Sequence, residues 1–291
     1  MKPAPFRYVA AYSLDHALAL KAEHGDEARF LAGGQSLLAA MNFRLAQPAF
    51  LIDINPLRDL DYVRRGGSVV RIGALTRYRT LQRDPVVANH QALLAEALPH
   101  VAHPQIRNRG TLAGNLAHAD PASELPAVVL AVGGKLCARS VKGERWIAVK
   151  DFFTGPLSTA LDAEEMLAEI ELPDLPARTG VCFLEVARRR GDYAMIGVAA
   201  TLTVDAGGTC VAARLTYCNA GGTPVSASAA AKALVGRRIS EKAIGEAAAA
   251  AMREIEPPGN VHASSDFQRH LAGVLTRRAL AKAHTRAMSA A

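Results

Sequence analysis

The chain has 291 residues, of which 50% are apolar and 21% are charged, and its formal net charge is +7. This length exceeds that of one typical hydrophobic core and the composition excludes a disordered or fibrous protein, so we expect two packed units. The densest basic run is only three arginines, at residues 188–190, which we interpret as a solvated turn or a docking surface and which argues against a nucleic-acid partner.

The first part of the chain alternates between helical and strand patterns. A helix is predicted at residues 14–24, because Ser13 is a good N-cap and Gly25 a good C-terminal stop. An apolar strand at 28–32 then runs into a glycine turn, after which a helix resumes at 37–41. The further elements expected here are strands at 50–54 and 68–73, helices at 76–83 and 91–98, and a second glycine turn at 111–115.

The pattern changes after residues 173–176, which read Pro-Asp-Leu-Pro. Three successive strands predict an antiparallel sheet, and helical patterns follow them. The strands are expected at 181–186, 196–204 and 211–217, and the helices at 227–235, 241–255 and 265–287. We therefore expect one domain at residues 1–176, made of two α/β lobes divided near residue 57, and a second domain at 177–291.

The four cysteines include no C-x-x-C pair, so no metal site is predicted in this chain. The N-terminus has no apolar segment of the kind found in signal peptides, and no apolar run approaches the ~20 residues of a membrane span. We therefore expect a cytoplasmic protein with free thiols.

The two glycine segments are the candidate site. Backbone N–H groups at a glycine turn that opens into a helix can hold the pyrophosphate of a dinucleotide. Gly33 and Gly34 permit a close approach, and Gln35 and Ser36 add side-chain donors. The motifs G-x-G-x-x-G and G-x-x-x-x-G-K-[ST] are absent, which leaves a Rossmann or P-loop site without support. Taken alone, each segment is also compatible with an ordinary turn.

An ordered set of motifs narrows this interpretation. It comprises AGGQSL at 32–37, LIDIN at 51–55, IGALT at 72–76, RGTLAGNLAHADPASELP at 109–126, ARRRGDYA at 187–194 and VHAS at 261–264. Over essentially its whole length the chain resembles the FAD-binding medium subunits of the molybdenum hydroxylases, the family that includes the flavin subunits of carbon monoxide dehydrogenase and xanthine dehydrogenase. The resemblance implies an α+β fold, with a PCMH-type two-lobed FAD-binding domain followed by a C-terminal domain of antiparallel sheet plus helices.

The resemblance also implies the contacts with FAD. Residues 32–36 and 111–115 would wrap the pyrophosphate, Thr76 would lie near the nucleotide half, and Asp120 would hydrogen-bond the ribityl chain. Val101 and Leu167 would line the flavin, and Tyr193 would cover the ring and gate the electron acceptor. The implied FAD-binding residues are Ala32, Gly33, Gly34, Gln35, Ser36, Leu37, Thr76, Val101, Thr111, Leu112, Ala113, Gly114, Asn115, Asp120, Leu167 and Tyr193.

Bland alternatives exist for several of these residues. Asp120 could simply cap the helix that begins there, and Tyr193 could be an ordinary half-buried aromatic. His103 and His118 are interpreted as local hydrogen-bonding residues, and no catalytic residue is predicted. Two positions depart from the family pattern, namely Ala113, where a second glycine is frequent, and Asn260, where an aspartate is common. The cysteines of an inserted iron–sulfur loop, found in some relatives, are missing.

The resemblance implies an oxidoreductase of three kinds of subunit, assembled as a dimer of heterotrimers. A large subunit with a molybdenum cofactor would oxidise the substrate, and a small subunit with two [2Fe–2S] clusters would pass electrons to FAD in this chain. An external acceptor such as a quinone, a cytochrome, NAD or oxygen would then receive them. Carbon monoxide, an N-heterocycle such as a purine alkaloid or nicotine, and an aldehyde all remain open as substrates. The rivals are a self-sufficient PCMH-type flavin oxidase or reductase and a non-catalytic nucleotide-binding module.

Overall fold

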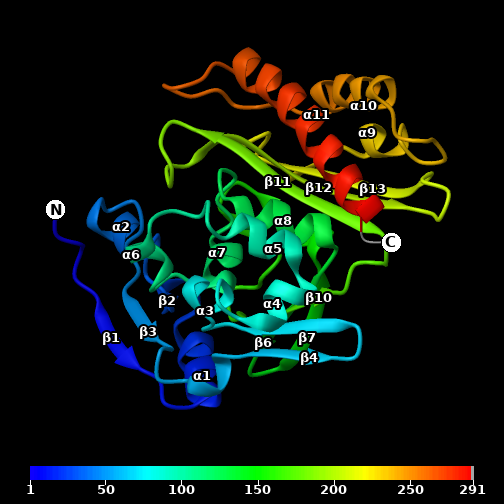
Figure 1. Cartoon of the computed structure of the whole chain (residues 1–291). Coiled ribbons are helices and arrows are strands. Elements are labelled where there is room, and N and C mark those ends of the chain that lie inside the picture. Colours follow the sequence, from blue (N-terminus) through cyan, green and yellow to red (C-terminus); the bar gives the residue numbers. More distant parts are fainter. Residues whose placement is uncertain (290–291) are drawn as a thin grey trace.

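The chain begins with a small parallel sheet. The structure is a computed structural model that describes residues 1–289 (Figure 1). Its first sheet has the order β1-β3-β2, with β1 at Arg7–Ala10, β2 at Ala28–Leu31 and β3 at Phe50–Asp53. The crossover helix α1 spans Leu14–His24, with Ser13 Oγ accepting a hydrogen bond from the N–H of His16 (3.1 Å). This helix has the predicted bounds, because both of its ends are set by local capping.

The second sheet is antiparallel throughout. Its order is β4-β5-β10-β6-β7, with β4 at Val63–Gly66, β5 at Val69–Gly73, β6 at Lys135–Ser140, β7 at Gly143–Ala148 and β10 at Met166–Pro173. Strand β5 agrees with the strand predicted at 68–73. Strand β10 lies between β5 and β6 and pairs with both, although it follows β5 by about a hundred residues in the chain. The alternating strand and helix pattern predicted for this part therefore does not produce a parallel sheet.

Short helices connect the strands of the second sheet. They are α3 (Tyr78–Leu81), α4 (Pro85–His90), α5 (Ala92–Ala97), α6 (Pro104–Arg107), α7 (Leu112–His118) and α8 (Glu124–Val132). Smaller elements are the 3-10 turns η1 (Gly25–Glu27), η2 (Arg58–Leu60) and η3 (Val149–Asp151), with the β8 (Phe153–Gly155) and β9 (Ser158–Thr159) pair. The helix predicted at 76–83 is shorter than expected, because Arg77 is extended (φ −75°, ψ 149°). The predicted second turn is instead the start of α7.

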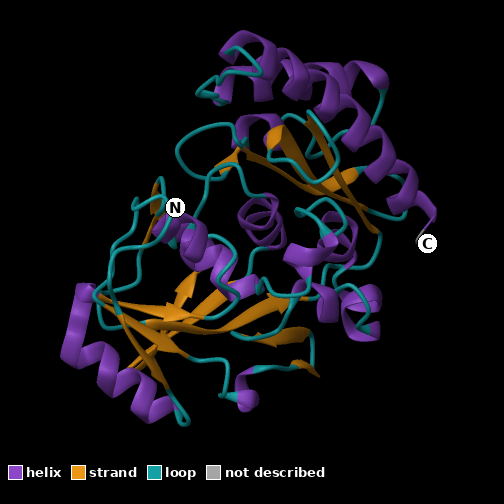
Figure 2. Cartoon of the chain, turned by 90° about the vertical axis from the view of Figure 1, so that its left-hand side faces the viewer, coloured by secondary structure: helices purple, strands orange, loops and turns teal. Residues whose placement is uncertain are grey.

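The C-terminal part has the predicted antiparallel sheet followed by helices. The strands are β11 (Thr179–Ala187), β12 (Ala194–Val204), β13 (Cys210–Cys218) and β14 (Val225–Ser226). The helices are α9 (Ser228–Lys232), α10 (Glu241–Glu254) and α11 (Ser265–Ser289). Helices α10 and α11 lie over the outer side of this sheet, and α5 and α8 lie between it and the second sheet (Figures 1 and 2). Because both faces are covered, β12 is apolar along nearly its whole length.

The alanine-rich helix α10 is closely packed. Its buried face consists of Ala243, Ala247, Ala248, Ala250 and Ala251. Small residues allow similarly close contacts elsewhere, since a Cβ added at Gly180 in β11 would lie 1.8 Å from the carbonyl oxygen of Ala283 in α11.

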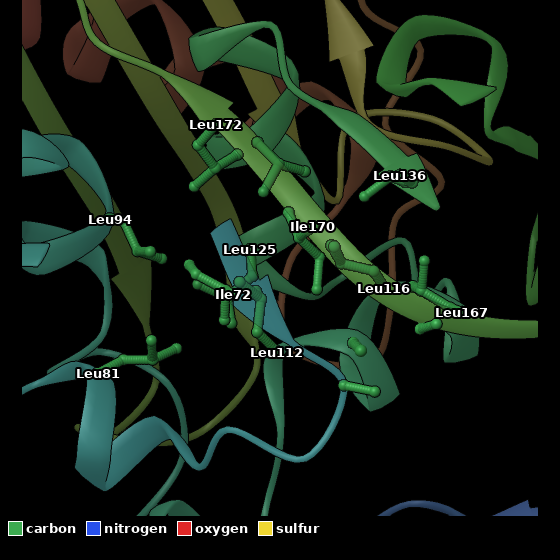
Figure 3. Close-up of a cluster of buried hydrophobic side chains, with 14 of the residues drawn as sticks. Ile72, Leu81, Leu94, Leu112, Leu116, Leu125, Leu136, Leu167, Ile170 and Leu172 are labelled. Carbon is green, nitrogen blue, oxygen red and sulfur yellow. The ribbon is translucent and has the colours of Figure 1, made fainter. Parts of the chain in front are cut away.

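The main hydrophobic core supports the second glycine segment. Figure 3 shows leucine and isoleucine side chains from the second sheet and from α3, α5, α7 and α8 pointing toward one another. Leu112 and Leu116 in α7 are fully buried in this core. Packing of these two side chains in the core therefore fixes the position of the start of α7. Within residues 1–289, no helix is long and apolar enough to cross a membrane.

Candidate FAD site

The first glycine segment is a turn with free backbone donors. It joins β2 to α2, which spans Leu37–Asn42, and Gly34 takes the left-handed conformation (φ +72°) that favours glycine. Within residues 1–289, the backbone N–H groups of residues 33–37 have no hydrogen-bond acceptor. The side chain of Gln35 bends back to donate to the carbonyl of Gly33 (3.0 Å), and the hydroxyl of Ser36 caps no N–H group. A run of unpaired N–H groups at a helix start is suited to binding an anion.

Gly33 brings the two glycine segments together. A Cβ added at Gly33 would lie 2.7 Å from the carbonyl oxygen of Arg109 and 2.8 Å from the Cα of Gly110. Backbone atoms cannot move aside as a flexible side chain can, so only glycine fits at this position. Residues predicted from two distant parts of the sequence thus lie next to each other.

The second glycine segment is a capped helix start. The Thr111 hydroxyl accepts a hydrogen bond from the N–H of Gly114 (3.0 Å), and the Thr111 carbonyl accepts from the N–H of Asn115 (3.1 Å). The amide of Asn115 also exchanges hydrogen bonds with the hydroxyl of Ser123 (2.7 and 2.9 Å). Ala113 is helical and 3% exposed, so its extra methyl group is accommodated in the core. The departure from a second glycine therefore causes no backbone strain.

Thr76 lies beside this segment, but its hydroxyl is engaged. The Thr76 Oγ1 atom donates to the carbonyl of Tyr62 (2.8 Å) and accepts from the N–H of Tyr62 (3.1 Å). Two residues later, the N–H of Tyr78 donates to the carbonyl of Gly110 (3.0 Å). Thr76 is fully buried and ties its segment to Tyr62, and the backbone of Tyr78 joins the same segment to the second glycine segment.

Asp120 and Tyr193 come together from two distant parts of the chain. Helix α8 begins at Glu124 and Asp120 Oδ1 instead accepts from the N–H of Ala122 (2.9 Å), so the helix-cap alternative for Asp120 is wrong. Tyr193 is 64% exposed, so the half-buried alternative is also wrong. Desolvation of its hydroxyl, and then the nearby Asp120 carboxylate, raise the pKa of Tyr193 to about 12.

The remaining predicted residues lie in or at the edge of the core. Val101, Leu112 and Leu167 are buried, and Ala32 is half-buried against the same cluster (Leu112 and Leu167 are drawn in Figure 3). Leu37 is the first residue of α2 and is half-buried. His103 lies at the N-cap of α6 and His118 in the last turn of α7, and the local hydrogen-bonding role of both side chains stays a prediction. Which atoms of FAD these residues touch stays a prediction.

Three residues that sequence reasoning missed belong to the same region. Glu124, four residues after Asp120, is 5% exposed, and burial raises its pKa to about 7. Arg77 and Asn55 connect the two glycine segments through side-chain hydrogen bonds. A carboxyl group at the start of an apolar helix was a readable signal, but nothing local distinguishes Arg77 from its neighbour Arg79.

Comparison with known families decides between the interpretations of these segments. Residues 4–175 match the model of the FAD-binding domain in molybdopterin dehydrogenases, and residues 181–283 match that of the carbon monoxide dehydrogenase flavoprotein C-terminal domain. The chain belongs to the FAD-binding medium subunits of the molybdenum hydroxylases. This family membership confirms the resemblance read from the sequence motifs and the presence of an FAD-binding domain.

Relatives of this family match along the whole chain. The chain is 40% identical to the 6-hydroxypseudooxynicotine dehydrogenase complex subunit alpha of Paenarthrobacter nicotinovorans, over 99% of this chain and 97% of that protein. It is 36% identical to the caffeine dehydrogenase subunit beta of Pseudomonas sp. strain CBB1, over 98% and 97%. Such relatives are subunits of dehydrogenases, which confirms that the chain is an oxidoreductase subunit.

Solved structures confirm the fold class. A chain of carbon monoxide dehydrogenase from Hydrogenophaga pseudoflava superposes with a TM-score of 0.96 at 38% identity, covering 98% of this chain and 99% of that one. A chain of quinoline 2-oxidoreductase from Pseudomonas putida 86 gives a TM-score of 0.94 at 38% identity, covering 99% and 100%. The α+β architecture of a two-lobed FAD-binding part followed by an antiparallel sheet and helices is therefore that of the medium subunits.

Proposed function

We propose that this chain carries FAD as the electron-transfer subunit of a heterotrimeric molybdenum hydroxylase. Electrons would come from two [2Fe–2S] clusters of a small subunit, after a large subunit with a molybdenum cofactor has oxidised the substrate. FAD, when bound, supplies the redox chemistry that passes these electrons to an external acceptor. We further propose that the FAD-binding domain comprises residues 1–176, in two lobes divided near 57, and that two heterotrimers pair.

One observation carries this proposal. The unpaired N–H groups of residues 33–37 point from a turn whose Gly33 lies against the backbone of Gly110, where no side chain fits. A diphosphate placed there would receive several backbone donors without displacing any side chain. The residues present therefore fit the pyrophosphate half of FAD.

This chain's own residues would bind and orient the cofactor. Backbone groups of residues 33–37 would hold the diphosphate, and the carboxylate of Asp120 would accept a hydrogen bond from the ribityl chain. The exposed ring of Tyr193, held beside Asp120, would cover the flavin and limit the approach of an acceptor. No residue of this chain needs to act as an acid or a base on the substrate.

The relatives also bear on the choice of substrate. The matching proteins named as subunits of dehydrogenases include chains that act in complexes on 6-hydroxypseudooxynicotine, caffeine and carbon monoxide. This chain is 36–40% identical to all three, although carbon monoxide is chemically unlike the two N-heterocycles. The medium subunit therefore carries little information about the substrate, which would be chosen in the large subunit. Carbon monoxide, an N-heterocycle and an aldehyde stay open.

The rival function is a self-sufficient flavin oxidase or reductase. Such an enzyme needs a substrate pocket with its own acid or base against the flavin. The match of residues 181–283 to the carbon monoxide dehydrogenase flavoprotein C-terminal domain favours the electron-transfer function over this rival.

The test is an absorption spectrum of the chain purified alone and from its host, with co-purifying subunits identified by mass. We expect flavin bands that acid releases, and two partners that carry iron–sulfur and molybdenum. Flavin on a lone chain that turns over a substrate would establish the rival instead. A colourless protein in both preparations, unable to take up added FAD, would overturn both functions.

A further inference from the structure

A hydrogen-bonded chain of side chains connects the two glycine segments. The amide nitrogen of Asn55, just after β3, donates to the carbonyls of Leu31 (3.2 Å) and Ala32 (3.0 Å) at the entrance to the first segment. The amide oxygen of Asn55 accepts from the guanidinium of Arg77, which precedes α3. The same guanidinium donates to the carbonyl of Arg109, directly before the second segment. Asn55 and Arg77 thus span the boundary between the first and second sheets.

Arg77 is a half-buried cation without a direct ion pair. Within residues 1–289, no carboxylate forms a salt bridge with Arg77, and both of its hydrogen-bond acceptors are neutral oxygens. Partial burial and the neighbouring Arg109 lower the pKa of the Arg77 guanidinium, and the nearby Asp61 carboxylate offsets part of this effect. Arg58 lowers and Asp53 raises the same pKa. Arginine nevertheless stays protonated in proteins, so a half-buried positive charge is held between the two segments.

We infer that Arg77 and Asn55 are positioning residues of the FAD site, which set the separation of the two glycine segments and place one half-buried positive charge beside the diphosphate. The inference rests on the proposed function. A planar guanidinium can donate to two carbonyl or amide oxygens in fixed directions, which a lysine ammonium cannot reproduce. A bound diphosphate would bring negative charge close to this guanidinium, whose own hydrogen-bond acceptors are neutral oxygens.

The geometry distinguishes Arg77 from other arginines nearby. Arg79, two residues later, is exposed and donates only to the side chain of Asn108 (3.1 Å). It has the same charge and a similar place in the sequence, but it does not join the two segments. Arg79→Met is therefore the matched control for Arg77→Met.

The test is FAD titration of the full-length apo chain by quenching of flavin fluorescence. Loss of hydrogen bonds to a charged group costs roughly 1.5–3 kcal/mol, so Arg77→Met should raise the Kd for FAD by roughly 10- to 100-fold. Asn55→Ala should raise the Kd for FAD in the same range. The Kd of the double variant should rise by much less than the product of the two single increases, because both substitutions break the same chain of hydrogen bonds. Arg79→Met should bind FAD as the unaltered chain does.

Two further readouts separate positioning from general stability. The Kd of the unaltered chain should increase with salt concentration, and Arg77→Met should flatten this dependence because the buried charge is gone. Arg77→Lys should keep the salt dependence but recover only part of the affinity. An unchanged affinity of Arg77→Met for FAD would overturn the inference. So would a lower affinity in which the salt dependence is intact and the effects of the two single variants on Kd multiply. If the unaltered chain itself fails to bind FAD, the proposed function fails instead.

Discussion

The two glycine segments look alike in the sequence but differ in structure. Both precede a helix and carry small residues followed by an amide or hydroxyl side chain. In the first, residues 33–37 keep their backbone N–H groups unpaired, whereas in the second Thr111 occupies those of Gly114 and Asn115. Within residues 1–289, the N–H groups of Leu112 and Ala113 also have no acceptor. The first segment therefore presents its unpaired N–H groups in a turn, and the second presents them at the start of a helix that Thr111 caps. Similar motifs can thus offer donors from a turn in one place and from a capped helix in another.

The sharpest test of this difference is Gly33→Ala. The added methyl would collide with backbone atoms at 2.7 and 2.8 Å, so the two segments must separate. We expect a loss of FAD affinity of at least ~100-fold, since several donors shift together. The control is Gly245→Ala, where an added Cβ meets nothing within 4 Å. Flavin titration of both variants measures the effect, and equal affinities would contradict the role given to the close approach.

Glu124 makes the stability of the folded chain depend on pH. Burial raises its pKa from 4.5 to about 7 in the folded chain, and Glu185, His100 and Asp120 lie around it. Its contribution to stability is complete below pH 4.5, where it is protonated in both states, and is lost as pH rises to about 7. Other ionisable groups near it are Tyr78, Tyr193 and Cys218.

Glu124→Gln removes this titration. The variant should gain stability relative to the unaltered apo chain by up to roughly 3 kcal/mol between pH 4.5 and 8. Urea unfolding at several pH values measures the difference. A constant difference across this range would show that Glu124 titrates normally, and Glu241→Gln, at an exposed position, serves as the control.

Thr111→Val tests whether the second segment acts through helix capping. Loss of the hydroxyl leaves the N–H of Gly114 unpaired, so we expect the free energy of unfolding to fall by about 1 kcal/mol. FAD affinity should fall by less than in Gly33→Ala. Thr111→Ser keeps the hydroxyl and should restore both quantities in urea unfolding and flavin titration. A Thr111→Val variant of unchanged stability would argue against the cap.

The smallest expected effect is that of Ala113→Gly, which restores the residue frequent in the family. Because Ala113 is helical, glycine should lower the free energy of unfolding by roughly 0.5–1 kcal/mol. FAD affinity should stay within a factor of ~2, since the helix start is otherwise unchanged. A marked gain in affinity would show instead that the alanine methyl restricts the cofactor.

Local signals predicted the elements whose ends are set by nearby residues. Ser13 and Gly25 gave the bounds of α1, and strand-like runs joined by polar or glycine turns gave β11, β12 and β13. The shortened helix α3 was missed because Thr76 is held by Tyr62, a contact between distant residues. The start of α7 was taken for a turn because glycine at residue 114 suggested a break, although Thr111 caps a helix there.

Some features of the candidate site were likewise predictable from the sequence, and others were not. The motifs alone identified both glycine segments, Asp120 and Tyr193, and with them the family. Local patterns could not predict how the two glycine segments are held together. Arg77 and Asn55 connect them, and their hydrogen-bond partners lie in other segments of the chain. The same holds for the adjacency of Asp120 and Tyr193, which lie in separate motifs of the sequence.

The sequence by itself determined the bounds of α1, the strands and helices of the C-terminal part, the two segments that carry glycine and the family to which the chain belongs. Hydrophobic periodicity, helix caps and turn residues act over a few positions, so a linear sequence displays them. Only the tertiary structure decided which N–H groups remain free, where β10 pairs, and that a half-buried arginine joins both segments. These features depend on packing between residues far apart along the chain, where burial and unpaired charge are defined.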